Sequence, residues 1–186
     1  MKLEKRHINF ENYCKQIIGL QIDSVDYYEI AYDKNNPASN YKTHYPEIDS
    51  IDFSIVLHMP NDKVEIFWDG EFYQYGIGLR INEKSVYDGY QSWNVSDSDL
   101  WLNIIGQKII DIKIAWELVK TEEQNTGKKE DFIYPQDLTL IFSNGQKVFI
   151  SVSGFLNQND PEVYGLLDNL TVTTNEELAR KVKMIS

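Results

Sequence analysis

The chain has 186 residues, 42% hydrophobic and 13% aromatic, which is enough for one domain, or two small ones, with a buried core. Its formal net charge of -11 argues against binding to nucleic acid or to an anionic membrane, because both need clustered Lys and Arg. Such a charge would attract a basic partner, although an acidic surface can also serve solubility alone.

The single cysteine, Cys14, excludes an intramolecular disulfide and a cysteine metal cluster, which suits a reducing compartment. It lies in a predicted helix, where a buried and inert thiol is expected rather than a nucleophile. No apolar run long enough for a signal peptide or a membrane span follows the basic first residues. We therefore expect a cytoplasmic protein that does not associate with membranes.

Five short matches in the same order indicate an internal repeat. They pair Ile17-Ile18-Gly19 with Ile104-Ile105-Gly106, Tyr45-Pro46 with Tyr134-Pro135, Asn61-Asp62 with Asn144-Gly145, Tyr75-Gly76 with Tyr164-Gly165, and Asn82-Glu83 with Asn175-Glu176. The offsets run from 83 to 93 residues and change where loops are expected. The sequence therefore predicts a tandem duplication of about residues 8–86 and 95–186, which divides the chain into residues 1–94 and 95–186.

Each unit is expected to open with a short helix. The candidate N-cap residues are Asn9 in the first unit and Ser96 or Ser98 in the second. Gly19 and Gly106 suit the left-handed position that follows a helix. A strand comes next in each unit, over residues 21–32 and 107–119, where apolar and polar side chains alternate.

A β-hairpin follows in each unit, and its apolar faces predict its register. In the first unit, a two-residue loop at Asn61-Asp62 would pair Met59 with Val64, Leu57 with Ile66, and Ile55 with Trp68. In the second unit, a three-residue loop, Ser143-Asn144-Gly145, would bring Leu138, Leu140 and Phe142 to the face of Val148, Ile150 and Val152. Gly145 would then take the left-handed position of a G1 bulge.

A further strand ends each unit, over residues 75–81 and 168–174. The second unit adds a C-terminal helix, in which Thr174 and Glu177 are expected to form a capping box. Its apolar stripe is Leu178, Val182 and Ile185. The predicted fold class is α+β and β-rich: a unit of one helix and four antiparallel strands, used twice about a pseudo-two-fold axis.

The predicted hairpin places His58 opposite Glu65 on the face away from the core, with Asp69 further along the strand. A histidine beside a carboxylate can be a general base or a pH switch, but a cross-strand charge pair on a wet face is the favoured interpretation. The second unit has Ile141 and Phe149 near the equivalent positions. Its copy of this face is therefore expected to be covered, by a helix or by a partner.

The segment Ser96-Asp97-Ser98-Asp99 alternates carboxylates as part of a calcium loop does. It lacks the glycine and the distal glutamate of such a loop, and an acidic helix start explains it better. The sequence contains no nucleophile elbow, phosphate loop or zinc-ligand spacing. We therefore expect a protein that is not an enzyme and that holds no metal or cofactor.

Residues 87–93 read YDGYQSW and follow neither the helix nor the strand period. The candidate partner-binding residues are Tyr87, Asp88, Tyr90 and Trp93 from this segment, with Tyr73 and Tyr75 upstream. Tyr and Trp anchor interfaces because they bury a large area at low entropic cost. Either these rings pack one unit against the other, or they form an exposed aromatic and acidic patch for a basic partner; a sugar site is a third, minor option.

The stretch LTLIFSNGQKVFISVSG, residues 138–154, resembles hairpins of small, uncharacterised bacterial proteins of the polymorphic-toxin immunity type. That resemblance implies a small, acidic, β-rich cytosolic protein that neutralises a toxin by covering its active site. We therefore expect a non-enzymatic protein-binding protein whose partner is a basic, nuclease-like toxin. The alternative is a small-molecule or carbohydrate-binding module with its site at the junction of the two units.

Overall fold

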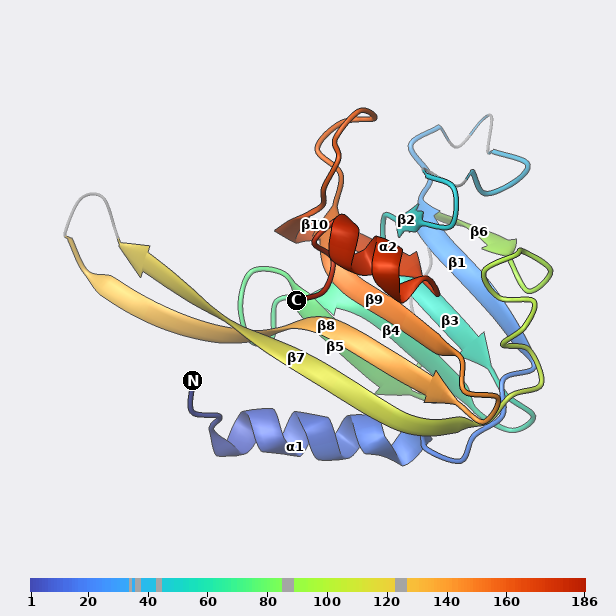
Figure 1. The fold of residues 1–186 in the computed structure, drawn as a ribbon, viewed down its shortest axis with the longest axis horizontal. Helices are drawn as coiled ribbons and strands as arrows, with labels where there is room; N and C mark the ends of the chain where they lie inside the picture. The colour runs from blue at the N-terminus through green and yellow to red at the C-terminus, as the bar shows by residue number, and fades with distance from the viewer. Residues whose placement is uncertain (34, 36–37, 43–44, 85–88, 123–126) are drawn as a thin grey trace.

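The computed structural model describes residues 1–186 except 34, 36–37, 43–44, 85–88 and 123–126. Within the described residues the chain forms two five-stranded antiparallel sheets with few helices (Figure 1). In chain order the elements are α1 (Lys5–Cys14), η1 (Lys15–Ile17), β1 (Ser24–Ile30), β2 (Asp49–Ile51), β3 (Ser54–His58), β4 (Lys63–Asp69), β5 (Gly76–Ile81), β6 (Tyr90–Asn94), β7 (Ile109–Glu122), β8 (Lys129–Phe142), β9 (Lys147–Gly154), β10 (Tyr164–Thr173) and α2 (Glu176–Lys181).

Sheet 1 has the strand order β5-β4-β3-β1-β6, and sheet 2 has the order β2-β10-β9-β8-β7. The neighbouring strands pair antiparallel throughout both sheets. Sheet 1 is built from residues 1–94, and sheet 2 is built from residues 95–186 with the exception of β2. The β-rich, antiparallel character of the predicted fold is confirmed.

The main core lies between the two sheets, where β5 contacts β8 and β9, and β10 contacts β4. Leu57 of β3 and Leu140 of β8 are both fully buried in this single apolar cluster. A second, smaller cluster lies on the other face of sheet 2, where Phe149 of β9 is joined by Ala179 and Val182 from the C-terminal helical region. The part of this face around Phe149 is therefore covered by a helix, as expected, whereas a hollow remains around Ile141.

The hairpin of β3 and β4 keeps the predicted apolar face but not the predicted partners. Leu57 faces Val64, and Ile55 faces Ile66, so the register is shifted by two residues. The cause is the connection, which is a four-residue turn closed by a hydrogen bond from the Met59 N–H to the Asp62 carbonyl (2.9 Å). A shift of two residues preserves the face of every side chain, because side chains alternate with period two.

The hairpin of β8 and β9 forms as predicted. Leu140 faces Val148 and Leu138 faces Ile150, and the loop is Ser143–Gly145. Gly145 has a φ of 83°, the left-handed conformation of a G1 bulge.

The helix before Gly19 forms, but it begins earlier than expected. The N-cap of α1 is Glu4, whose N–H donates to the Nδ1 of His7 (2.8 Å) in a capping box, so Asn9 lies inside the helix. Gly19 and Gly106 have φ values of 95° and 81°, so both take the predicted left-handed conformation. The N-cap of α2 is Asn175, whose side chain accepts from Leu178, so the predicted capping box at Thr174 is wrong by one residue.

The helix expected before Gly106 is a series of turns rather than a continuous helix. Single helical hydrogen bonds run from the Leu102 N–H to the Ser98 carbonyl (2.8 Å) and from the Ile105 N–H to the Trp101 carbonyl (3.1 Å). The Oγ of Ser96, a predicted cap, instead accepts a hydrogen bond from Val25 of β1 (2.9 Å). This segment is tied to sheet 1, and Ser96 does not act as a cap.

Two backbone segments join the halves of the chain directly, one before β1 and one before β7. They pair around an antiparallel bridge between Gln21 and Lys108. The hydrogen bonds run from the Gly19 N–H to the Ile109 carbonyl (2.8 Å), from the Gly106 N–H to the Ile22 carbonyl (2.7 Å), from the Ile22 N–H to the Gln107 carbonyl (3.0 Å), and from the Ile109 N–H to the Leu20 carbonyl (2.9 Å).

The outer parts of β7 and β8 extend beyond β9 as a two-stranded ribbon, which projects from the body of the molecule (Figure 1). Its strands pair from Trp116 and Pro135 out to Glu122 and Lys129. Across the described residues, no helix has the length and apolar character needed to span a membrane.

Candidate functional site

Four aromatic side chains form a continuous strip along one end of sheet 1. Tyr75 precedes β5, Trp68 is near the end of β4, Phe53 precedes β3, and Tyr90 begins β6. Their ring centroids lie 5.3, 6.0 and 4.4 Å apart along that order. All four side chains are half-buried, so each is anchored in the fold and leaves part of its ring accessible to a partner.

Three carboxylates lie beside this strip. The N–H of Asp52 donates to the Oε1 of Glu29 (3.4 Å), and the indole N–H of Trp68 donates to the carbonyl of Asp52 (3.2 Å). Burial raises the pKa of Glu29 to about 7, and the charge of Asp52 adds to this effect. Burial also raises the pKa of Asp52, and the charge of Asp168 on β10 raises it further. A cation placed here would relieve the repulsion between these carboxylates.

Tyr32 completes the surface and is 81% exposed. Its hydroxyl is hydrogen-bonded to Asp52, which raises the pKa of Tyr32 to about 12. The acidic–aromatic surface is defined here as Glu29, Tyr32, Asp52, Phe53, Trp68, Tyr75, Tyr90 and Asp168.

The aromatic residues that the sequence predicted as partner-binding lie in different parts of the structure. Tyr75 and Tyr90 lie in the acidic–aromatic surface. Tyr73 stacks on Phe132 of β8 with ring centroids 4.6 Å apart, and Tyr134 is 6.2 Å away. Tyr73 therefore packs the β4–β5 connection against a strand of the other sheet, which agrees for this residue with the interpretation that the rings pack one unit against the other.

Trp93 lies away from the strip, on β6. Its indole N–H donates to the carbonyl of Ala38 (2.9 Å), and its ring lies 5.9 Å from that of Tyr41. It lines a hollow of about 440 Å³ together with Ser39, Asn40, Tyr41, Asp49, Ser92, Asn94, Val95, Asp97 and Ser98. Tyr87 and Asp88 lie outside the described residues.

The predicted pair of His58 and Glu65 does not form, because the register of the hairpin is shifted. His58 faces Lys63, and its Nε2 lies 2.8 Å from the carboxylate of Asp26 on β1. Glu65 faces Arg80 on β5 and forms an ion pair with it at 2.6 Å. The two residues therefore have separate partners, Asp26 for His58 and Arg80 for Glu65.

Glu65 is fully buried, so the expectation of a wet charge pair is wrong for this residue. Asp69 lies at the other end of β4, where its carboxylate accepts from the N–H of Glu71 (3.0 Å) and burial raises its pKa. His58, Glu65 and Asp69 are thus not brought together into one site. In the described part of the chain, no group of three or more His, Cys, Asp and Glu side chains is arranged to hold a metal ion.

Sequence reasoning did not select five members of the surface: Glu29, Tyr32, Asp52, Phe53 and Asp168. Trp68 was assigned to the core face of its strand alone. The sequence did hold a partial clue to these residues. When antiparallel strands follow one another in the chain, the end of one strand lies beside the start of the next. A search for acidic and aromatic residues could therefore have compared three segments: the end of β1, the end of β4 and the residues before β3.

Comparison of the chain with protein-family models, with curated proteins and with solved structures finds no match.

Proposed function

We propose that the protein is a non-enzymatic binding protein that recognises a basic protein partner through the acidic–aromatic surface. The observation that carries this proposal is the position of Asp52, which is hydrogen-bonded to Glu29 and to the half-buried Trp68 and lies within the electrostatic influence of Asp168. A lysine or arginine of a partner would neutralise carboxylates whose pKa values are raised. Arginine can also stack on an aromatic face, which Tyr and Trp side chains offer here.

The partner class follows from the charge of the whole chain. A net charge of -11 would speed the association with a positively charged surface and disfavour association with acidic proteins. A nuclease-like toxin presents such a surface, because its substrate is a polyanion. We propose the role of an immunity protein, which would act in the cytoplasm by covering the active site of that toxin.

The decisive experiment compares two variants of equal net charge in a pull-down from the native host. In the first, Glu29→Gln, Asp52→Asn and Asp168→Asn neutralise the surface. In the second, Glu122→Gln, Glu130→Gln and Asp131→Asn neutralise three exposed carboxylates of the projecting ribbon. We expect a basic partner to be retained by the ribbon variant and to bind the surface variant at least about tenfold more weakly, since paired charges at interfaces contribute more than about 1.4 kcal/mol.

Circular dichroism of both variants, read alongside the pull-down, checks that each is folded. Equal retention of the partner by both variants would contradict a role for the acidic–aromatic surface. A tagged native protein that captures no basic partner would favour the alternative, a small-molecule or carbohydrate-binding module.

We also propose that the two halves of the chain are copies of one unit, related by a pseudo-two-fold axis. Gly106 and Ile109 follow Gly19 and Ile22 by 87 residues each. A pseudo-two-fold axis would exchange Gly19 with Gly106 and Ile22 with Ile109. It would therefore convert the hydrogen bond from Gly19 to Ile109 into the hydrogen bond from Gly106 to Ile22, and both are present. Gln21 and Lys108, which bridge each other, are also 87 residues apart, as expected for residues on the axis.

The strand registers support the same relation. The cross-strand row in sheet 1 is Tyr27, Ile55, Ile66 and Leu79, and its counterpart in sheet 2 is Ile114, Leu138, Ile150 and Val172. The sequence match of Tyr45 with Tyr134 does not fit, because Tyr134 lies in β8 and Tyr45 lies before β2. An experimental structure in which the two rows fail to superimpose would contradict the duplication.

A further inference from the structure

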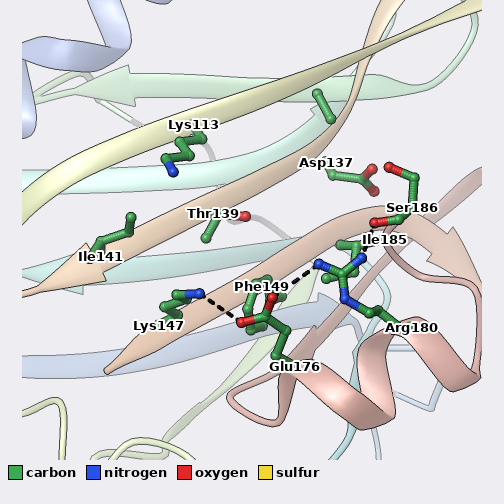
Figure 2. A pocket seen from close by; sticks show the side chains of 11 residues that line it. Lys113, Asp137, Thr139, Ile141, Lys147, Phe149, Glu176, Arg180, Ile185 and Ser186 are labelled. Atoms are coloured by element: carbon green, nitrogen blue, oxygen red, sulfur yellow. Dashed lines mark hydrogen bonds and ion pairs between the residues drawn. The ribbon is translucent and has the colours of Figure 1, made fainter. Parts of the chain in front are cut away.

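The outer face of sheet 2 carries a hollow beside α2. Strands β7, β8 and β9 form its floor, and α2 with the last residues of the chain forms one side (Figure 2). Its volume is about 230 Å³. The residues that line this α2 hollow are Lys113, Ala115, Asp137, Thr139, Ile141, Lys147, Phe149, Glu176, Arg180, Ile185 and Ser186.

Cationic side chains gather here although the chain as a whole is acidic. Lys147 and Arg180 both pair with Glu176, at 2.6 and 3.0 Å (Figure 2). Lys113 lines the same hollow and forms no ion pair with another residue in the described ranges. Lys113 is therefore available to an anionic group that enters the hollow.

Asp137 offers a hydrogen-bond acceptor to the same hollow. It is 6% exposed, and its Oδ1 has no hydrogen-bond partner among the residues that the structure describes. Its carboxyl group does accept a hydrogen bond from Ser151, while burial raises the pKa of Asp137 to about 7. A buried acceptor without a partner costs free energy in the empty protein. A ligand that donates a hydrogen bond to Oδ1 would recover that free energy.

The strand register places the two residues at neighbouring positions of the sheet. Lys113 faces Thr139 across β7 and β8, and Asp137 faces Ala115, so Lys113 and Asp137 are diagonal neighbours. Diagonal positions on adjacent strands are roughly 7–8 Å apart. Figure 2 shows the two side chains on either side of Thr139.

We propose that the α2 hollow binds a small organic acid that also carries a hydrogen-bond donor, such as an amino acid or a hydroxy acid. Its acid group pairs with Lys113, and its ammonium or hydroxyl group donates to the Oδ1 of Asp137. Ile141 and Phe149 contact the apolar part of the ligand. This site does not depend on the proposed binding of a protein partner, since the two surfaces share no residue.

The test follows the backbone amide NMR signals of the full chain while probes are added singly. The probes are the twenty protein amino acids and the hydroxy acids lactate, glycerate and malate. Acetate and ethylamine serve as controls, since each carries only one of the two groups. We expect at least one amino or hydroxy acid to shift the signals of residues 113, 137–141 and 147–149 saturably, and neither control to do so at the same concentration.

Variants then assign the contacts. Lys113→Gln and Asp137→Asn are each expected to weaken binding of that probe by about tenfold or more, the effect of losing one charged hydrogen bond. Lys120→Gln, also exposed on β7 but outside the hollow, should leave the affinity unchanged. Three results would each overturn the proposal. They are the absence of a saturable shift with any probe, binding of acetate as tight as that of the acids with a donor, and full affinity in Lys113→Gln.

Discussion

Replacement of Asp137 by Asn is expected to stabilise the protein at neutral and alkaline pH. The folded state holds the pKa of Asp137 at about 7, whereas the ordinary value is 3.8. Each unit of such a difference corresponds to about 1.4 kcal/mol, so the ionised carboxylate costs up to roughly 4 kcal/mol above pH 7. The gain in Asp137→Asn will be smaller if the new amide lacks a partner.

The sign of the pH dependence is fixed by the direction of the shift. Because the pKa of Asp137 is higher in the folded state, its cost is absent below about pH 4 and grows as the pH rises to about 7. The charge of Glu117 on β7 raises this pKa further. The other charged side chains that line the two hollows beside Asp137 are Lys113, Lys147, Glu176, Arg180 and Lys183. Asp137→Asn should remove most of this slope from the unfolding free energy.

Chemical denaturation between pH 4 and pH 8 measures the effect. Asp131→Asn, an exposed position on the same strand, is the matched control and should change the stability by less than about 0.5 kcal/mol. Equal stability of Asp137→Asn and the native protein at pH 8 would show that Asp137 is compensated by a cation or by water.

Replacement of Arg80 by Met is expected to destabilise the protein by about 3 kcal/mol or more, because it removes an ion-pair partner from a buried carboxylate. Glu65 is fully buried and its carboxylate lies 2.6 Å from the guanidinium of Arg80. The guanidinium carbon also lies 4.3 Å from the ring centroid of Phe67. These contacts predict a structural role for Glu65.

The double variant Glu65→Gln with Arg80→Met should recover part of that loss, because no charge then remains at this buried position. Arg6→Met is the control, since Arg6 and Glu4 form an ion pair in which both side chains are more than half exposed. Thermal denaturation gives the comparison. A loss as small in Arg80→Met as in Arg6→Met would contradict a structural role for the pair.

Sequence periodicity predicted the sheets well where apolar residues alternate over a long stretch. Leu138 and Leu140 could face the core in only one way, and Gly145 fixed the loop between β8 and β9. The first hairpin also kept its face, but its four-residue turn could not be read from the Asn61-Asp62 pair. The strand β2 has only three residues, too few to show a period.

The candidate site was less predictable because its members come from distant parts of the chain. Asp168 acts on Asp52 although 116 residues separate them, and it belongs to the other sheet. Trp68 follows the apolar alternation of the core face of β4, so its position at the end of the sheet depends on where that strand ends. The pairing of His58 with Glu65 failed for the same reason that the hairpin register did, namely the length of one turn.

The proposed function is tested most directly by amide hydrogen exchange of the protein alone and in complex with its captured basic partner. The account predicts slower exchange in peptides that cover residues 29–32, 52–53, 68–75 and 90, and unchanged exchange in the ribbon of β7 and β8. Protection confined to that ribbon or to α2, with none at the acidic–aromatic surface, would contradict it.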